Sequence, residues 1–212
     1  MCRLYRLGLP LSLFMMLFMS ISFASVKSVK EEAVNLKLAY PVVIFVNQKA
    51  QDKVNTDIQH RVQAFRAEKI AGKFIDGDFS FTTKYEDENY LSLLLCEYRY
   101  TGGAHGMPTY TGVTYNKQTG AVIPLTFFVH LRSEDATRIL ALPVYNWKNE
   151  VIPENLLNSY RDKEPLTGNY YLMGAGNIAL IFQPYQLAAY AAGVTHIILT
   201  PALQKELNQQ NS

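Results

Sequence analysis

One long amphipathic segment, residues 47–72, most narrows the folds open to this chain. Its apolar residues recur at spacings of three and four: Ala50, Val54, Ile58, Val62 and Phe65. That repeat predicts a helix with one buried and one wet face, for which Asn47 is a suitable N-cap and Gly72 a suitable end. Asp57 and Arg61 stand four apart with the acid first, which favours a surface ion pair and is no evidence of a site.

Most of the other patterns are those of short β-strands joined in hairpins. Strand-like alternation or short apolar runs occupy residues 34–41, 79–85, 90–100, 110–115, 121–125, 170–173, 177–182 and 196–200. The turns at 87–89, 116–120 and 174–176 predict three hairpins. Pro41 predicts an edge position or the end of the first strand. Antiparallel pairing is therefore the expected local arrangement.

Two further helices are expected in the second half of the chain. After Ser133, which can cap a helix, apolar residues keep roughly helical spacing as far as Val151, although Pro143 should kink or split this helix. Pro201 opens a short terminal helix. Because helices and hairpins are segregated along the chain, we expect an α+β fold, with an antiparallel sheet of hairpins packed against one long helix and shorter helices. No linker or repeat divides residues 25–212, which predicts a single domain.

The first 24 residues have the features of a signal peptide. Arg3 and Arg6 form a positive start, an apolar stretch follows over residues 7–21, and Ser22-Phe23-Ala24 supplies the small residues that a signal peptidase reads. We expect cleavage after Ala24 and a secreted or periplasmic domain. The alternative is an uncleaved anchor, because the apolar stretch is nearly long enough to span a bilayer. Only in that case is a membrane an expected partner.

Charge and cysteine content limit the partners further. Without Arg3 and Arg6 the 20 Lys and Arg become 18, equal to the 18 Asp and Glu. Tight nucleic-acid binding needs a basic face, which an even and interspersed charge pattern does not supply, so nucleic acid is not expected. Cys96 remains once Cys2 leaves with the leader, and in the apolar run 93–96 we expect it to be buried, unpaired and unreactive.

Two stretches resemble a known family. The first reads Tyr100-Thr101-Gly102-Gly103-Ala104-His105-Gly106 and continues to Gly120; the second covers residues 170–172 and 182–193 and ends at Thr200. They resemble the extracytoplasmic domain of unknown function shared by RsiV-type anti-sigma factors, which bind lysozyme, and by some peptidoglycan deacetylases as an amino-terminal module. The resemblance spans roughly residues 30–207. It implies a binding or sensing domain at the cell envelope, with lysozyme as the first candidate ligand.

The chain departs from the family pattern at three positions. Gln186 stands where an acidic residue is expected, Ala189 stands where a proline is expected, and the acidic residues expected near Thr126 are missing. Only residues 1–6 precede the apolar stretch and only a short polar tail follows Leu207. We therefore expect neither a direct anti-sigma factor nor a catalytic deacetylase.

The candidate ligand contacts are Gly102, Gly103, His105, Tyr110, Tyr185 and Tyr190, and all but Tyr110 lie in the two loop-like segments 102–106 and 183–193. The glycines of residues 102–106 allow unusual backbone angles and the close approach of another chain. Exposed tyrosines provide the amphipathic rings that protein or glycan partners favour. The structural alternative is a tight turn in which His105 caps a carbonyl, with the tyrosines in the core.

No cluster of residues predicts a particular chemistry. The four histidines, His60, His105, His130 and His196, are dispersed, and no His-Glu-x-x-His motif or cysteine pair accompanies them. We expect no metal and no cofactor. With the binding role that the resemblance implies, we expect a non-catalytic binding domain with a protein or glycan ligand. The alternative is a hydrolase acting on an envelope polymer, with His105 as its acid or base, or with two carboxylates such as Glu86 and Glu97 meeting across a cleft.

Overall fold

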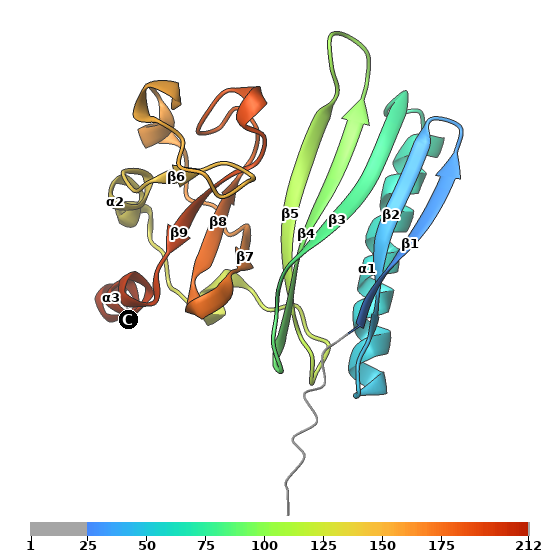
Figure 1. The fold of residues 1–212 in the computed structure, drawn as a ribbon, viewed down its shortest axis with the longest axis horizontal. Helices are drawn as coiled ribbons and strands as arrows, with labels where there is room; N and C mark the ends of the chain where they lie inside the picture. The colour runs from blue at the N-terminus through green and yellow to red at the C-terminus, as the bar shows by residue number, and fades with distance from the viewer. Residues whose placement is uncertain (1–24, 212) are drawn as a thin grey trace, which may run out of the picture.

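The computed structural model describes residues 25–211, which form two β-sheets standing side by side with helices on their outer faces (Figure 1). The fold is α+β, as predicted. The expected signal peptide, residues 1–24, lies outside the described residues. Among residues 25–211, no helix is long and apolar enough to cross a bilayer.

The first sheet has the strand order β1-β2-β3-β4-β5. Its strands are β1 (Ser25–Ala33), β2 (Leu36–Ile44), β3 (Asp76–Glu86), β4 (Tyr90–Tyr100) and β5 (Met107–Asn116). Helix α1 (Gln48–Ile70) joins β2 to β3, which run parallel, and all other neighbours in this sheet are antiparallel. The predicted hairpin of residues 79–85 and 90–100 is confirmed as β3 and β4. Strand β1 lies outside the predicted strands.

Helix α1 agrees with its prediction. The Asn47 side chain accepts a hydrogen bond from the Ala50 amide at 3.2 Å, and all five predicted apolar positions are buried. They pack in one cluster with first-sheet residues such as Phe79 and Leu93. The Asp57–Arg61 ion pair is present at 2.8 Å, and Asp57 also accepts a hydrogen bond from the buried Tyr115 hydroxyl at 2.7 Å.

The strand predicted over residues 34–41 is β2, and it extends beyond the predicted end. β2 continues through Pro41 to Ile44, because it pairs with β3 only over Leu36–Leu38 and the missing N–H of Pro41 therefore costs no bond to β3. Beyond Leu38, a side chain of α1 forms hydrogen bonds with backbone groups of β2 that β3 does not pair. The Asn55 side chain accepts from the Val43 amide at 2.9 Å and donates to the Val43 carbonyl at 3.0 Å.

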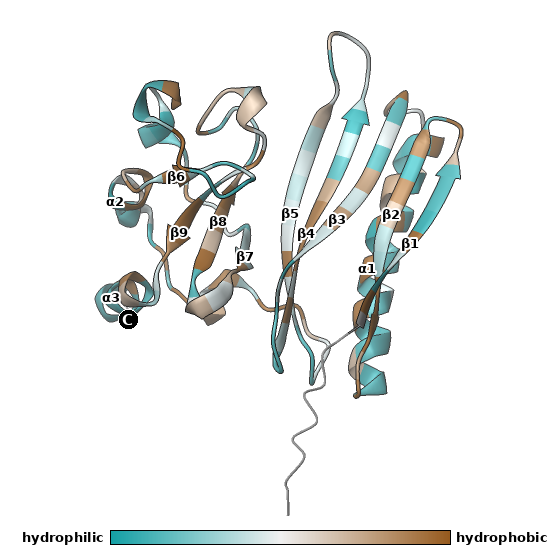
Figure 2. Ribbon diagram, viewed as in Figure 1, coloured by the Kyte–Doolittle hydropathy of each residue, from teal (hydrophilic) through white to brown (hydrophobic). Residues whose placement is uncertain are grey.

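The second sheet has the order β6-β9-β8-β7 and is antiparallel throughout. It comprises β6 (Val144–Tyr145), β7 (Tyr170–Leu172), β8 (Ile178–Phe182) and β9 (Thr195–Leu199), with helices α2 (Ala136–Leu140) and α3 (Pro201–Asn211). The predicted hairpin around residues 174–176, the last strand and the terminal helix are confirmed. The central strands β8 and β9 are strongly hydrophobic (Figure 2).

Two predicted elements are shorter than predicted. The hairpin of residues 110–115 and 121–125 forms only at its turn, where Tyr115 bridges Val122 and the Ile123 amide donates to the Thr114 carbonyl at 2.8 Å. The return segment ends at Pro124, and β5 pairs along its length with β4 instead. The helix from Ser133 ends at Leu140, because Pro143 stops it. The chain then becomes strand β6, so Trp147, whose spacing fits the predicted helix, lies beyond that helix and is 57% exposed.

The two sheets meet where β5 faces β7. Gly112 makes this approach possible, since a β-carbon there would lie 1.8 Å from the Tyr170 carbonyl oxygen. The Asn169 side chain accepts from the Gly112 amide at 2.7 Å and donates to the Tyr110 carbonyl at 2.8 Å. A small apolar cluster that includes Leu94 and residues of β7 and β8 fills the space between the sheets.

The long strands give the first sheet two distinct ends (Figure 1). The β4–β5 loop, residues 101–106, lies at one end, near the loops that follow β8. Ser25 lies toward the other end, where the turn after β5 also lies. The candidate ligand contacts and the start of the described chain are therefore far apart.

Candidate functional site

The structure brings together three of the predicted contacts, His105, Tyr185 and Tyr190. The rings of His105 and Tyr190 stack with their centroids 4.3 Å apart and an interplanar angle of 29°. The Tyr185 ring lies 5.5 Å from that of Tyr190, and its hydroxyl is 3.4 Å from His105 Nε2. His105 belongs to the first sheet's loop and both tyrosines follow β8, so the cluster joins the two sheets. We call these three residues the aromatic cluster.

The loop of residues 101–106 has the backbone that its glycines predict. Gly102 and Gly103 adopt φ values of +109° and +96°, in the region that favours glycine. Both are exposed, and the Tyr100 hydroxyl donates to the Gly103 carbonyl at 2.9 Å. Their observed role is therefore to shape the loop that carries His105.

Gly106 is the fixed end of this loop. It is buried, its amide donates to the Tyr98 hydroxyl at 3.1 Å, and its carbonyl accepts from the Tyr190 hydroxyl at 3.1 Å. His105 Nδ1 also lies 2.9 Å from the Gly106 carbonyl oxygen. The histidine thus contacts a backbone carbonyl, as the structural alternative predicts, while its ring remains exposed at the surface.

Tyr185 is held in a strained conformation. Its φ of +74° is left-handed, which costs free energy for a residue with a side chain. The Asn158 side chain donates to the Tyr185 carbonyl at 2.6 Å and to the Gln186 carbonyl at 3.2 Å, and the Tyr160 hydroxyl donates to the Tyr185 carbonyl at 3.1 Å. Sequence reasoning missed Asn158 and Tyr160, because nothing local to either residue signals a contact with residues more than twenty positions away.

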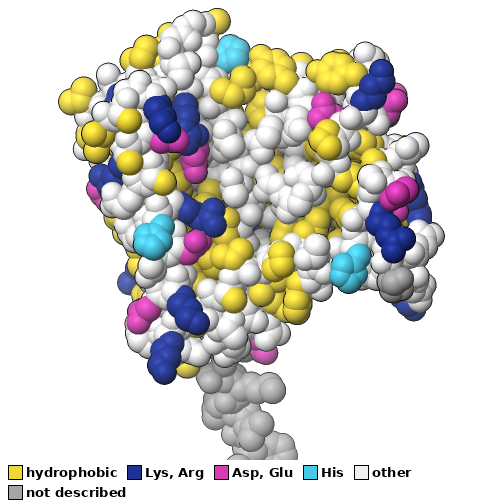
Figure 3. Space-filling model, turned by 180° about the vertical axis from the view of Figure 1, so that it is seen from behind, with side chains coloured by type: hydrophobic (Ala, Val, Ile, Leu, Met, Phe, Trp, Pro, Cys, Tyr) yellow, Lys and Arg dark blue, Asp and Glu magenta, His cyan; other side chains and the backbone are white. Residues whose placement is uncertain are grey.

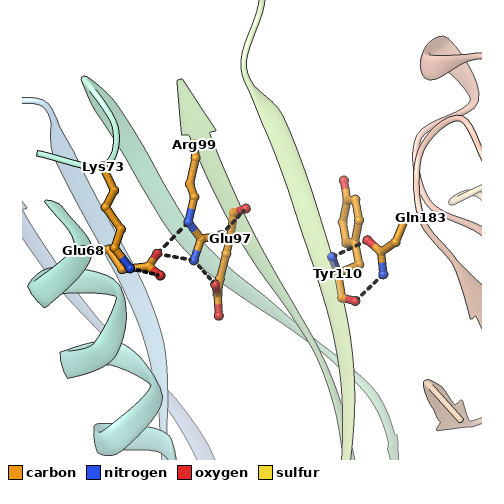
Figure 4. A network of polar contacts seen from close by, with 6 residues as sticks. All are labelled: Glu68, Lys73, Glu97, Arg99, Tyr110 and Gln183. Carbon is orange, nitrogen blue, oxygen red and sulfur yellow. Dashed lines mark hydrogen bonds and ion pairs between the residues drawn. The ribbon is translucent and has the colours of Figure 1, made fainter. Parts of the chain in front are cut away.

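Tyr110 lies between the sheets and is only partly exposed. Its amide donates to Gln183 Oε1 at 2.8 Å, and Gln183 Nε2 donates to its carbonyl at 2.7 Å (Figure 4). Gln183 opens the segment that carries Tyr185 and Tyr190. This paired contact therefore fixes that segment against β5, and Tyr110 supports the cluster through its backbone.

Cys96 is a neighbour of Tyr110 and is only half-buried, so the prediction of a fully buried thiol is wrong, although the thiol is free as predicted. It stands at the point where β4 passes from its fully buried stretch to a partly exposed one. Burial is the largest of the effects that raise the pKa of the Cys96 thiol. A thiol of this kind is a poor nucleophile.

Replacing Gln183 by alanine should loosen the aromatic cluster, whereas Asn169→Ala should not. Each variant removes amide bonds to the same edge strand, so each should lower the free energy of unfolding by about 1–3 kcal/mol. Only Gln183 leads into the segment of Tyr185 and Tyr190. We expect the ring-current shift of the His105 protons, measured by NMR, to shrink in Gln183→Ala alone. Equal shifts in the two variants would contradict this role.

The charged residues near the loop are paired with one another, between β4 and the end of α1. Arg99 contacts Glu97 at 2.5 Å and Glu68 at 2.8 Å, and Lys73 contacts Glu68 at 3.4 Å (Figure 4). Glu86 pairs instead with Lys117 at 3.0 Å. Glu86 lies opposite Leu91, six residues along β4 from Glu97, which separates the two carboxylates by about 20 Å. They do not meet across a cleft.

The observed partners of His105 are a backbone carbonyl and a tyrosine. Within residues 25–211, no carboxylate is hydrogen-bonded or ion-paired to His105, and no group of three potential metal ligands occurs. Burial and the neighbouring Tyr98 and Tyr185 raise the pKa of Tyr190, so its phenol stays neutral. On the face shown in Figure 3, Lys and Arg side chains lie toward the sides, and the strip between them is mainly hydrophobic or uncharged. The cluster suits contact and hydrogen bonding.

Comparisons with known proteins agree with this fold. Residues 27–108 match the family model described as Deacetylase PdaC. No curated protein matches. A DUF3298 family protein of Bacteroides fragilis is similar in structure, with a TM-score of 0.60, 16% identity and coverage of 90% of this chain and 95% of that one. A DUF3298 family protein of Pseudomonas aeruginosa has a TM-score of 0.59, 12% identity and coverage of 89% and 94%. The chain thus has the fold of these DUF3298 proteins.

Proposed function

We propose that this chain is an exported, non-catalytic binding domain of the cell envelope, and that its ligand is a macromolecule seated on the aromatic cluster. The proposal of export rests on the sequence of residues 1–24. The proposal of an envelope role draws on the likeness of residues 27–108 to the PdaC deacetylase family and on the resemblance to lysozyme-binding proteins. Lysozyme is the first protein ligand to test, and an envelope glycan is the other candidate class.

The observation that carries the proposal is the conformation of Tyr185. A left-handed non-glycine residue persists only where its surroundings over-determine it, and such strain is concentrated at functional sites. Here two side chains hold the backbone, and the ring that results is 44% exposed beside His105 and Tyr190. Packing alone gives no reason to hold an aromatic ring at the surface in this way. Recognition of a ligand does, because Tyr is favoured as an anchor in interfaces.

Alanine variants of the aromatic cluster test the proposal. His105→Ala, Tyr185→Ala and Tyr190→Ala should each weaken lysozyme binding by about 1 kcal/mol or more, because interface energy concentrates in a few aromatic anchors. Binding by calorimetry and the melting temperature are measured on the same samples. We expect the melting temperature to stay close to that of the parent chain.

Two outcomes would count against this site. Variants that melt early in step with their loss of binding would show that the cluster is scaffold, since truncating core aromatics costs about 3–5 kcal/mol of stability. Variants that bind lysozyme and soluble peptidoglycan fragments as well as the parent chain does would show that the ligand lies elsewhere.

A further inference from the structure

Trp147, the single tryptophan of the chain, lies in a hydrogen-bonded turn. It is 57% exposed, in the loop of residues 146–150 between β6 and the bridge residue Val151. The Asn146 side chain accepts from the amides of Lys148 and Glu150 at 2.9 and 3.0 Å, and Asn149 adopts a left-handed φ of +64°. This turn therefore fixes the position of an indole that solvent largely surrounds.

Trp147 is continuous with the aromatic cluster. Its ring covers Gly193, where a β-carbon would meet the indole at 3.3 Å. The Gly193 amide donates to the Tyr190 carbonyl at 2.9 Å, and Tyr190 stacks on His105. One chain of contacts thus leads from the β6 turn of the second sheet to the β4–β5 loop of the first.

The loop of residues 154–163 extends the surface in the same manner. Tyr160 is 49% exposed while its hydroxyl bonds to the Tyr185 carbonyl, and the nearby Leu156 is 59% exposed. These contacts link four loops: residues 101–106, 146–150, 154–163 and the segment that follows β8. The ammonium of Lys148 lies 5.2 Å from the centroid of the indole ring.

We propose that Trp147 belongs to the same binding surface as the aromatic cluster, and that this surface takes a folded protein. The inference rests on the proposed function and deepens it. Protein interfaces are enriched in exposed Trp, Tyr and Met and depleted of Lys, Glu and Asp at their centres. Tyrosines on glycine- and asparagine-containing loops, held rigid before binding, are also the composition of antibody binding surfaces.

The single tryptophan makes the test direct. The chain of residues 25–212 is labelled with 5-fluorotryptophan, which yields one fluorine resonance, and titrated with lysozyme or with soluble peptidoglycan fragments. Measurements at low and high salt distinguish specific binding from non-specific charge attraction, which salt weakens. We expect the resonance to move saturably with lysozyme and to stay fixed with the glycan fragments. We expect Trp147→Ala to weaken lysozyme binding at least tenfold, with an unchanged melting temperature.

Phe127→Ala is the matched control. Phe127 is another exposed aromatic, but it lies against Tyr90 at the opposite end of β4, so its removal should leave the affinity unchanged. Lysozyme binding with an unmoved resonance and an unaffected Trp147→Ala variant would overturn the extension to Trp147 and leave the proposed function intact. A resonance that moves with glycan fragments alone would overturn the protein assignment. Absence of binding to both probes would overturn the proposed function as well.

Discussion

Gly112→Ala is expected to destabilise the protein by about 3 kcal/mol or more, at the upper end of the cost of overpacking. The added methyl group would lie 1.8 Å from the Tyr170 carbonyl oxygen and 2.8 Å from Ile181 Cδ1. The first of these atoms is backbone and cannot turn away, so β5 and β7 must separate. Separation would also break the Gly112 amide bond to Asn169. A loss of this size is a large part of the stability of an ordinary domain.

Gly174→Ala supplies the control for this effect. A β-carbon at Gly174 meets nothing within 4 Å, and its φ is not in the left-handed region. Unfolding in denaturant, followed by circular dichroism, should place Gly112→Ala far below the parent chain and Gly174→Ala close to it. Equal midpoints for the two variants would show that the sheets can part at this point without cost.

The second large effect is an acid-induced loss of stability caused by His196. This residue is 2% exposed, and its Nε2 has no hydrogen-bond partner. Burial, and next the charge of Lys84, lower the pKa of His196 from 6.5 to about 4. Its imidazole lies 5.5 Å from the Tyr145 ring on β6 and 5.7 Å from the Tyr171 ring on β7. Lys84 faces the same Tyr171 ring from β3, at 4.6 Å.

The sign of the pH dependence follows from this lowered pKa. Between pH 6.5 and 4 the unfolded chain binds a proton at His196 that the folded chain does not, so the free energy of unfolding falls as the pH falls. The stability that is complete above pH 6.5 should decrease by about 3 kcal/mol by pH 4, at 1.36 kcal/mol per pKa unit. Below pH 4 this contribution no longer changes.

Two variants isolate the contribution of His196. His196→Leu should abolish the slope of unfolding free energy between pH 6.5 and 4, while stability at pH 7 changes little because an unpaired buried nitrogen is lost. Lys84→Met should narrow the pH window and reduce the total loss, because removal of the nearby positive charge raises the pKa of His196 in the folded chain. The other three histidines are exposed in the structure and serve as an internal reference. An unchanged slope in His196→Leu would assign the acid sensitivity to other groups.

Sequence reasoning succeeded where the signal is local. Helix α1 is predicted in its cap and its buried face, because a single amphipathic repeat of more than twenty residues has few alternatives. The hairpins β3–β4 and β7–β8 are predicted because each has a turn signal between two strand patterns that are adjacent in the sequence. The pairing of β5 with β4 is not predicted, because the turn at residues 116–120 signals only the local return segment, which bridges β5 at Val122 and ends at Pro124. The sequence assigns Trp147 to a helix because its spacing fits one, but Pro143 ends that helix before Trp147 is reached.

The candidate site was predictable in part. His105, Tyr185 and Tyr190 stand out as members of two glycine- and tyrosine-rich segments, and the structure joins them although some eighty residues separate His105 from Tyr185. What joins them is long-range: the amide pair between Gln183 and Tyr110, and the Asn158 contacts that hold Tyr185. Neither has a signature in local composition, since amide side chains are as frequent in surface loops as in such contacts.

The opposed ends of the first sheet have a practical consequence for any tethered form of the protein. Strand β5 runs ten residues from the loop end to the Ser25 end, which corresponds to about 30 Å. A support or fusion attached at Ser25 would hold the β4–β5 loop and the segment that follows β8 at about that distance and leave them open to the surroundings. Immobilisation through this end therefore suits binding measurements, whereas attachment within residues 146–163 would shield the surface under test.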